Sequence, residues 1–253
     1  MPNPSAGRVP MSPVPGPMAG KVVLVSGASA GIGEAVVRAL GGAGASVFGF
    51  ARGEERLRKA ADAWRAAGID VRTAAGDVSV EADVDRIVRA ALDAYGRIDI
   101  LVNNAGIAPV RAVEGHPVDV WDRTIAVNLR GPFLLTRRVL PDMLRRGAGD
   151  IVNVSSVAGL QAFGEMSAYC ASKFGLQGFT QALAHEVRKR GIRVVAVCPG
   201  AVSTPIWEGI DPSADRTRML RADDVARAVL DVLLLSRQAT VDQIVLTPPD
   251  GIV

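Results

Sequence analysis

The chain contains few cysteine, histidine and aromatic residues, and these shortages exclude several classes of protein. Among its 253 residues are two cysteines, Cys170 and Cys198, and two histidines, His116 and His185. They are too few and too scattered for a structural zinc site or for a secreted disulfide framework. We expect Cys170 to be a small buried thiol and His185 to be a surface residue.

Long apolar runs and an excess of one charge are also missing. Runs such as Val22 to Val25 are far shorter than the about 20 apolar residues that span a bilayer. The 29 basic and 26 acidic residues are interspersed and leave a net charge of +3, with no basic stripe for nucleic acid. The sequence therefore predicts no membrane span and no nucleic-acid partner.

The first 17 residues, MPNPSAGRVPMSPVPGP, contain repeated proline and lack the apolar segment of a secretory signal. We expect a disordered lead over residues 1–17, a domain over residues 18–253 that starts naturally near Met18, and a cytoplasmic location. The hydrophobic fraction of 49% and the charged fraction of 22% are typical of a soluble globular protein.

A glycine-rich turn follows the first expected strand. Residues 22–25 form a buried-strand run, residues 26–33 read SGASAGIG, and residues 34–40 have a helical pattern. Glycines at 27, 31 and 33 would let the backbone approach a pyrophosphate at the positive end of the helix. Because strand, turn and helix occur in the required order, the pattern predicts the opening of a dinucleotide-binding βαβ unit.

Tyr169 and Lys173 lie four residues apart in a segment with a helical pattern, QAFGEMSAYCASKFGLQGF. On a helix this spacing places the phenol and the ammonium group on one face. A neighbouring cation favours the phenolate, which makes the pair a plausible general acid/base for an alcohol oxygen. Taken alone, the spacing also fits an amphipathic helix with a solvated lysine.

Several motifs together resemble the short-chain dehydrogenase/reductase family, in order and spacing, from about Met18 to the end of the chain. They are the glycine motif with Ser26 in place of the usual threonine, NNAG at 103–106, Asn128 within VNLRGPF, the serines at the end of IVNVSS, the Y-x-x-x-K pair, and Pro199-Gly200 after a strand.

This resemblance implies an α/β fold, with one doubly wound Rossmann-fold domain around a seven-stranded parallel sheet. It also implies four catalytic residues. Tyr169 would exchange a proton with the substrate oxygen, Lys173 would favour the phenolate and bind the nicotinamide ribose, Ser156 would position the carbonyl oxygen, and Asn128 would hold a water that links the relay to solvent. Ser156 is chosen over Ser155 because it lies 13 residues before Tyr169. No metal is required.

The cofactor residues follow partly from the glycine turn and partly from the resemblance. They are Gly27, Ser29, Gly31, Ile32, Gly33, Arg52, Asp77, Val78, Asn104, Ala105, Gly106, Tyr169, Lys173, Pro199, Gly200, Val202 and Thr204. Asp77 could contact adenine or simply occupy a turn, and structural and binding roles are hard to separate for residues 103–106.

The expected strand at Ser46 to Phe50 ends without the carboxylate that binds the ribose of NAD. Arg52 stands there instead and could clamp a 2′-phosphate, so NADP(H) is favoured over NAD(H). Two observations weaken this preference: Ala30 occupies a position that is usually basic in the family, and Glu54 could turn back to the ribose.

The expected substrate pocket comprises Ser156, Gln161, Phe163, Tyr169 and Trp207, with Trp207 open to a packing or subunit role instead. Residues 205–219 would form a short lid. The proline-containing end of the chain is similar to the branch of the family that acts on small 3-hydroxy acids and related alcohols.

We therefore expect an enzyme that interconverts a ketone or aldehyde and an alcohol, as a homodimer or homotetramer built through the long helices around Asn128 and Tyr169. A 3-oxoacyl thioester reductase is the nearer alternative, with Arg216, Arg218 and Arg221 as its basic residues near the lid. A dinucleotide-sensing protein without turnover is the more distant one.

Overall fold

The computed structural model describes residues 15–251. Of the lead expected over residues 1–17, residues 1–14 lie outside the described part. Met18 is buried, and its amide donates a hydrogen bond to the Ala43 carbonyl at 2.9 Å. The beginning of the described chain is thereby attached to the end of the first helix.

Seven strands form the main sheet, and two more make a small ribbon. The strands are β1 (Val22–Ser26), β2 (Ser46–Ala51), β3 (Val71–Ala75), β4 (Ile100–Asn103), β5 (Gly149–Val154), β6 (Ile192–Pro199), β7 (Val202–Ser203), β8 (Leu220–Arg221) and β9 (Gln243–Leu246). The helices are α1 (Gly31–Gly42), α2 (Glu54–Ala66), α3 (Glu81–Tyr95), α4 (Val118–Ile125), α5 (Gly131–Arg146), α6 (Ser167–Val187) and α7 (Ala222–Leu234). None of the helices between residues 15 and 251 is long and apolar enough to cross a membrane.

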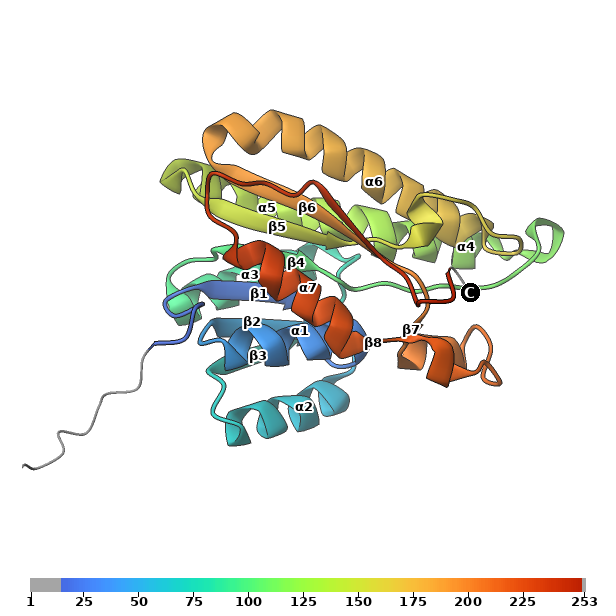
Figure 1. Ribbon diagram of the computed structural model, residues 1–253, viewed down its shortest axis with the longest axis horizontal. Coiled ribbons are helices and arrows are strands. Elements are labelled where there is room, and N and C mark those ends of the chain that lie inside the picture. The colour runs from blue at the N-terminus through green and yellow to red at the C-terminus, as the bar shows by residue number, and fades with distance from the viewer. Residues whose placement is uncertain (1–14, 252–253) are drawn as a thin grey trace, which may run out of the picture.

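The main sheet has the order β3-β2-β1-β4-β5-β6-β9, and all its pairings are parallel. Its central strands β1, β4 and β5 are buried along their whole length and mostly apolar because helices cover both faces. Figure 1 shows α1, α2 and α7 on one side of the sheet and α3, α5 and α6 on the other. The prediction of one doubly wound domain with seven parallel strands is confirmed.

The long helix expected around Asn128 is not one regular α-helix. A π-helical stretch, Ala126–Arg130, separates α4 from α5. Its wider turn contains Asn128, whose side chain hydrogen-bonds to neighbouring segments. Single π turns inside α-helices occur frequently at functional sites.

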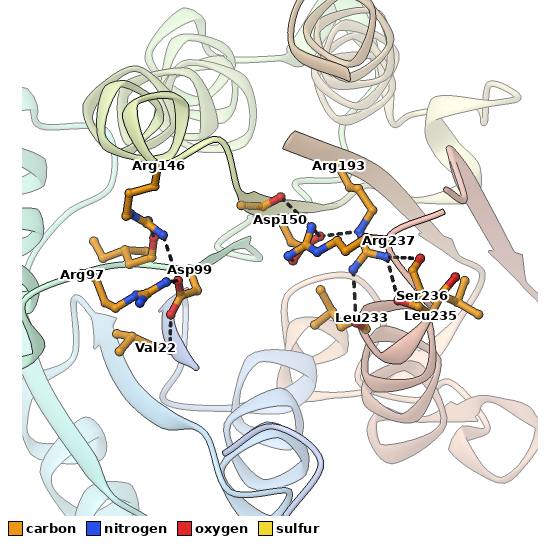
Figure 2. A network of polar contacts seen from close by, with 12 residues as sticks. Val22, Arg97, Asp99, Arg146, Asp150, Arg193, Leu233, Leu235, Ser236 and Arg237 are labelled. Carbon is orange, nitrogen blue, oxygen red and sulfur yellow. Dashed lines mark hydrogen bonds and ion pairs between the residues drawn. The ribbon is translucent and has the colours of Figure 1, made fainter. Parts of the chain in front are cut away.

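Two buried carboxylates stand at the amino ends of the central strands, at the edge of the sheet where β4 and β5 begin. Asp99, just before β4, accepts hydrogen bonds from Arg97, from Arg146 at the end of α5, and from the Val22 amide. Figure 2 places these groups together on one side of the view.

Asp150, in β5, forms the second half of this network. It accepts hydrogen bonds from Arg193 of β6 at 2.6 Å and from Arg237 at 2.8 and 3.0 Å. Arg193 also donates to carbonyls at the end of α7, as drawn in Figure 2. The network joins β5, β6 and the segment after α7, and it leaves the opposite edge of the sheet for the site.

Candidate active site

A cavity of about 1110 Å³ lies at the carboxyl ends of the parallel strands. It is lined by residues that follow β1, β2, β3, β4, β5 and β6, and the strand order reverses between β1 and β4. In open α/β sheets this reversal creates a crevice in which ligands bind. Two of the three motif glycines, Gly27 and Gly31, the expected tyrosine and lysine, and the first part of the lid all contribute to this one cavity, whereas Gly33 lies behind its wall.

The glycine turn is shaped so that only glycine fits. Gly27 and Gly31 have φ of +67° and +58°, which side chains rarely adopt. A Cβ on Gly33 would lie 2.3 Å from the Gly27 carbonyl oxygen. The residue before α1, Ala30, provides no side-chain cap, so the first amides of the helix stay available to an anion in the cavity. This cradle fits the pyrophosphate of a dinucleotide.

Ser26 and Asn104 hold the cradle in place. The Ser26 hydroxyl accepts hydrogen bonds from the amides of Asn104 and Ala105 at 3.0 and 3.1 Å. The Asn104 side-chain amide donates to the carbonyls of Ser26 and Gly27. Serine therefore supplies the hydroxyl that the family takes from threonine, and Asn104, Ala105 and Gly106 border the cavity.

Basic side chains line the part of the cavity beyond β2 and β3. Arg52 lies on its wall, and Arg56, one helical turn further, donates from Nε to the Ser29 hydroxyl at 3.2 Å. Arg56 was not expected in the site; it lies in the first turn of α2, whereas Arg52 precedes that helix. Two guanidinium groups thus border the region in which the sequence predicts the adenosine ribose.

Asp77 and Arg123 form an ion pair on the wall of the same region. Arg123 donates to Asp77 and to the Ser79 hydroxyl, each at 2.5 Å. Burial alone would raise the pKa of the Asp77 carboxyl, but the hydrogen bonds from Arg123 and Ser79 outweigh it and lower that pKa. The sequence gives no local sign of Arg123, which lies 46 residues from its partner.

Ser156, Tyr169 and Lys173 converge on the opposite wall. Ser156 ends the segment after β5, where its hydroxyl accepts a hydrogen bond from the Ala158 amide at 3.1 Å. Tyr169 and Lys173 lie in the first two turns of α6, with the ammonium 5.7 Å from the phenol ring centroid. Lys173 is 4% exposed and donates to the Val154 carbonyl at 2.8 Å.

The electrostatics of this pair differ from the sequence expectation that the cation dominates. Burial raises the pKa of the Tyr169 phenol, and the hydrogen bond with Ser156 partly opposes the shift. Burial also lowers the pKa of Lys173 to about 8, opposed by Cys198. Enclosure by the protein therefore outweighs the attraction between the two groups and favours a protonated phenol, which is a proton donor.

Asn128 is fully buried behind this wall and does not line the cavity. Its Oδ1 accepts from the Ile107 amide at 2.9 Å, and its Nδ2 donates to the Ile107 carbonyl and to the Ser172 hydroxyl. A Cβ on Gly106 would lie 3.5 Å from Asn128 Oδ1 and 3.8 Å from Lys173 Nζ. The side chain thus fixes the segment after β4 beside Lys173. Its expected link to solvent stays a prediction.

The segment after β6 closes the cavity on a third side. Pro199, Gly200, Val202 and Thr204 line it as expected. The indole of Trp207 lines it as well, and its Nε1 donates to the Val202 carbonyl at 2.9 Å. Within this chain, Trp207 therefore has both of the roles that the sequence left open: it lines the pocket and it packs against the segment after β6.

The structure separates Gln161 from the expected pocket. Phe163 lines the cavity, whereas Gln161 is exposed and is not part of its wall. The amides of Leu160 and Gln161 both donate to the Val157 carbonyl at the end of the 3₁₀ turn Val157–Gly159, and both residues are exposed there. Met166 and Glu208 line the cavity without having been expected.

Among residues 15–251, no group of three or more histidine, cysteine, aspartate or glutamate side chains is arranged to hold a metal ion.

The family model of the short chain dehydrogenases matches residues 21–215 of this sequence. The chain belongs to this family, as its motifs predicted. It is therefore an oxidoreductase that acts on hydroxyl and keto groups.

Two curated relatives match most of the chain. A D-beta-hydroxybutyrate dehydrogenase of Cupriavidus necator is 41% identical over 187 residues, which cover 74% of this chain and 72% of the relative. A putative ketoacyl reductase of Streptomyces coelicolor is 42% identical over 188 residues, with the same coverage of both proteins.

Solved structures of the family are also similar. A variant of actinorhodin polyketide ketoreductase with NADPH has a TM-score of 0.84 at 35% identity, covering 90% of this chain and 96% of the other. A metagenomic short-chain oxidoreductase in complex with NADP has a TM-score of 0.81 at 34% identity, covering 92% and 98%. Levodione reductase has a TM-score of 0.83 at 33% identity, covering 90% and 96%.

Proposed function

We propose that this protein is an NADP(H)-dependent oxidoreductase that interconverts a ketone or aldehyde and the corresponding alcohol. The observation that carries the proposal is the convergence of Ser156, Tyr169 and Lys173 on a cavity whose other end is a glycine cradle flanked by two arginines. The bound nicotinamide would supply the hydride. The residues of this chain bind the dinucleotide and manage the proton.

In carbonyl reduction, the Tyr169 hydroxyl donates its proton to the oxygen that becomes an alcohol. The raised pKa of the phenol keeps that proton available near neutral pH. Ser156 directs a hydroxyl at the same oxygen. Lys173, held by the Val154 carbonyl, places a positive charge beside the phenolate that forms. Asn128 positions the segment next to Lys173 and, by resemblance, holds the water of the relay.

The preference for NADP(H) rests on Arg52 and Arg56. Both line the cavity after β2, where no carboxylate contacts the adenosine ribose region from the strand end. A planar guanidinium suits the 2′-phosphate of NADP(H). Two of the related structures contain NADPH or NADP.

The experiment is to follow NADPH and NADH oxidation in parallel with small ketones, 3-oxo acids, diketones and 3-oxoacyl thioesters. We expect turnover with NADPH and much slower turnover with NADH. Turnover with NADH alone would contradict the cofactor assignment. Failure of both dinucleotides over the whole panel, with tight binding retained, would favour the sensing alternative.

The thioester alternative is supported by the name of the Streptomyces relative. The arginines that could attract an acidic carrier are, however, partly neutralised: Arg218 pairs with Asp250 at 3.1 Å and Arg221 pairs with Asp224 at 2.9 Å. We therefore rank this function second, and the thioester in the panel distinguishes it.

We further propose a homo-oligomer that forms through α5 and α6. Phe133 of α5 is 46% exposed and Phe174 of α6 is 45% exposed, although both are large apolar side chains. The small residues Ala171 and Gly178 are exposed on α6 and would allow a second helix to approach closely. Light scattering should give a dimer or tetramer for the wild type, and Phe174→Glu should shift it toward the monomer.

A further inference from the structure

The two ends of the cavity differ in charge. The end that the dinucleotide would occupy is lined by Arg52, Arg56 and Arg123. The substrate end is lined mainly by apolar side chains, among them Ile107, Phe163, Met166, Ile206, Trp207 and Ile210. An apolar wall of this kind favours an apolar substituent on the substrate, because that substituent loses its contact with water on binding.

Within the described chain, Lys173 is the one cation that lines this substrate end, and it is already engaged. Its ammonium donates to the Val154 carbonyl at 2.8 Å behind the phenol, where the reaction itself requires it. At the other end, Arg123 pairs with Asp77 and Arg56 bonds to Ser29, and Arg52 lies where the dinucleotide would bind. A carboxylate on the substrate would therefore find no free cation at the substrate end.

The substrate end contains one carboxylate of its own. Glu208 closes the 3₁₀ segment Pro205–Glu208 of the lid, lines the cavity, and forms no salt bridge in the described part of the chain. Its neighbour Trp207 is fixed through Nε1 to the Val202 carbonyl, which holds this part of the lid in place. Glu208 is exposed to solvent on one side. A negatively charged substrate would approach it while losing part of its own hydration, and both effects oppose binding.

We propose that the site selects uncharged ketones or aldehydes with an apolar substituent, and that Glu208 is a specificity-determining residue that rejects carboxylates. This inference rests on the proposed carbonyl reduction and narrows its substrate class. It excludes small 3-hydroxy acids as substrates, which the proline-containing end of the sequence had suggested by resemblance. Cationic carbonyl compounds are tolerated better than anionic ones, because Glu208 attracts them.

The test compares three methyl ketones that differ in charge: acetoacetate, its neutral ethyl ester, and the acetonyltrimethylammonium cation. With NADPH, we expect kcat/KM for the ester to exceed that for acetoacetate on the order of tenfold. Glu208→Lys should raise kcat/KM for acetoacetate roughly fivefold and lower it for the cation, with the ester almost unchanged. Glu208→Gln should give intermediate values, and added salt should reduce these differences.

Glu186→Lys is the matched control. Glu186 is exposed on α6 and is not part of the cavity wall, so the same change in net charge should leave the order of the three ketones unchanged. Equal effects of Glu186→Lys and Glu208→Lys, or a wild type that prefers acetoacetate, would overturn the proposal.

A binding measurement separates this inference from the proposed function. Dissociation constants of the three ketones are measured by ligand-observed NMR on the Tyr169→Phe variant saturated with NADP⁺. If the ester binds more tightly than acetoacetate and no ketone is turned over by the wild type, charge selection stands and the proposed reaction fails. If turnover occurs and acetoacetate binds as tightly as the ester, charge selection fails and the reaction stands.

Discussion

Lys173 shows how a single active-site residue can lower the stability of the folded protein. Its ammonium is buried, and its pKa falls from 10.5 to about 8. Between these two values the unfolded chain binds more protons than the folded chain, so this lysine makes stability rise with pH. Below pH 8 the full cost of the buried charge is present.

We predict that Lys173→Met increases the free energy of unfolding at pH 7 by roughly 1 to 3 kcal/mol, because the cost of the buried charge exceeds the lost hydrogen bond. The gain should shrink as the pH rises from 8 toward 10.5, where the wild-type lysine loses its proton in both states. Urea unfolding at several pH values measures this, and carbonyl reduction should be lost in the same variant. If Lys173→Met instead lowers the free energy of unfolding at pH 7, the buried ammonium of Lys173 does not destabilise the fold.

Arg56 is the residue-scale test of the dinucleotide end. Arg56→Ala removes a guanidinium that lines the cavity and should raise KM for NADPH roughly tenfold, the effect of one hydrogen bond to a charged group. KM for NADH should hardly change. Arg58→Ala is the control, since Arg58 lies on the same helix but pairs with Glu55 and Asp62 at the surface. Equal losses with both dinucleotides would argue against a role at the 2′-phosphate.

At the scale of the element, α1 requires glycine at one position and only tolerates it at another. A Cβ at Gly33 would lie 2.3 Å from the Gly27 carbonyl, whereas a Cβ at Gly42 would meet nothing within 4 Å. We predict that Gly33→Ala weakens dinucleotide binding and destabilises the protein by about 1 to 3 kcal/mol.

Gly42→Ala should instead stabilise the protein by about 0.5 to 1 kcal/mol, because alanine is the better helix residue, and it should leave binding unchanged. Thermal unfolding and fluorescence titration with NADPH compare the two variants. Tight NADPH binding by Gly33→Ala would show that the binding site does not depend on the close packing of Gly33 against the Gly27 carbonyl.

Elements were predictable where their signal is local. The run at residues 22–25, the glycine turn and the Tyr169–Lys173 spacing each lie within one short segment, and the structure contains the corresponding strand, turn and helix. The π-helical stretch was missed because its residues continue a helical pattern. Gln161 was placed in the pocket because its neighbours are pocket residues, whereas it is exposed at the end of a 3₁₀ turn.

At the scale of the whole molecule, the contacts that sequence could not predict connect distant segments. Arg123 contacts Asp77 across 46 positions, and Arg237 contacts Asp150 across 87. Charged residues are common on surfaces, so no pattern distinguishes these from solvated ones. The ion network at the amino ends of β4 and β5 became visible only with the fold.

This network provides a prediction about the molecule as a whole. Asp150→Asn should destabilise the protein by about 2 to 3 kcal/mol. The loss is somewhat less than for a fully buried pair, because Arg193, which loses its counter-charge, keeps 16% of its side chain exposed and Arg237 is half exposed. Asp231→Asn, which breaks an exposed pair with Arg227, should cost less than about 1 kcal/mol. Thermal unfolding distinguishes the two, and kcat/KM should stay at the wild-type value in both. Equal small losses would mean that the network contributes little.

The central claim is that Tyr169 moves the proton in a dinucleotide-dependent reduction. The measurement that tests it most directly is NADPH oxidation by the wild type and by Tyr169→Phe with one neutral ketone, alongside the NADPH dissociation constant of each. We predict that Tyr169→Phe loses turnover by roughly a hundredfold or more and binds NADPH almost as tightly as the wild type. Turnover retained by Tyr169→Phe would contradict it.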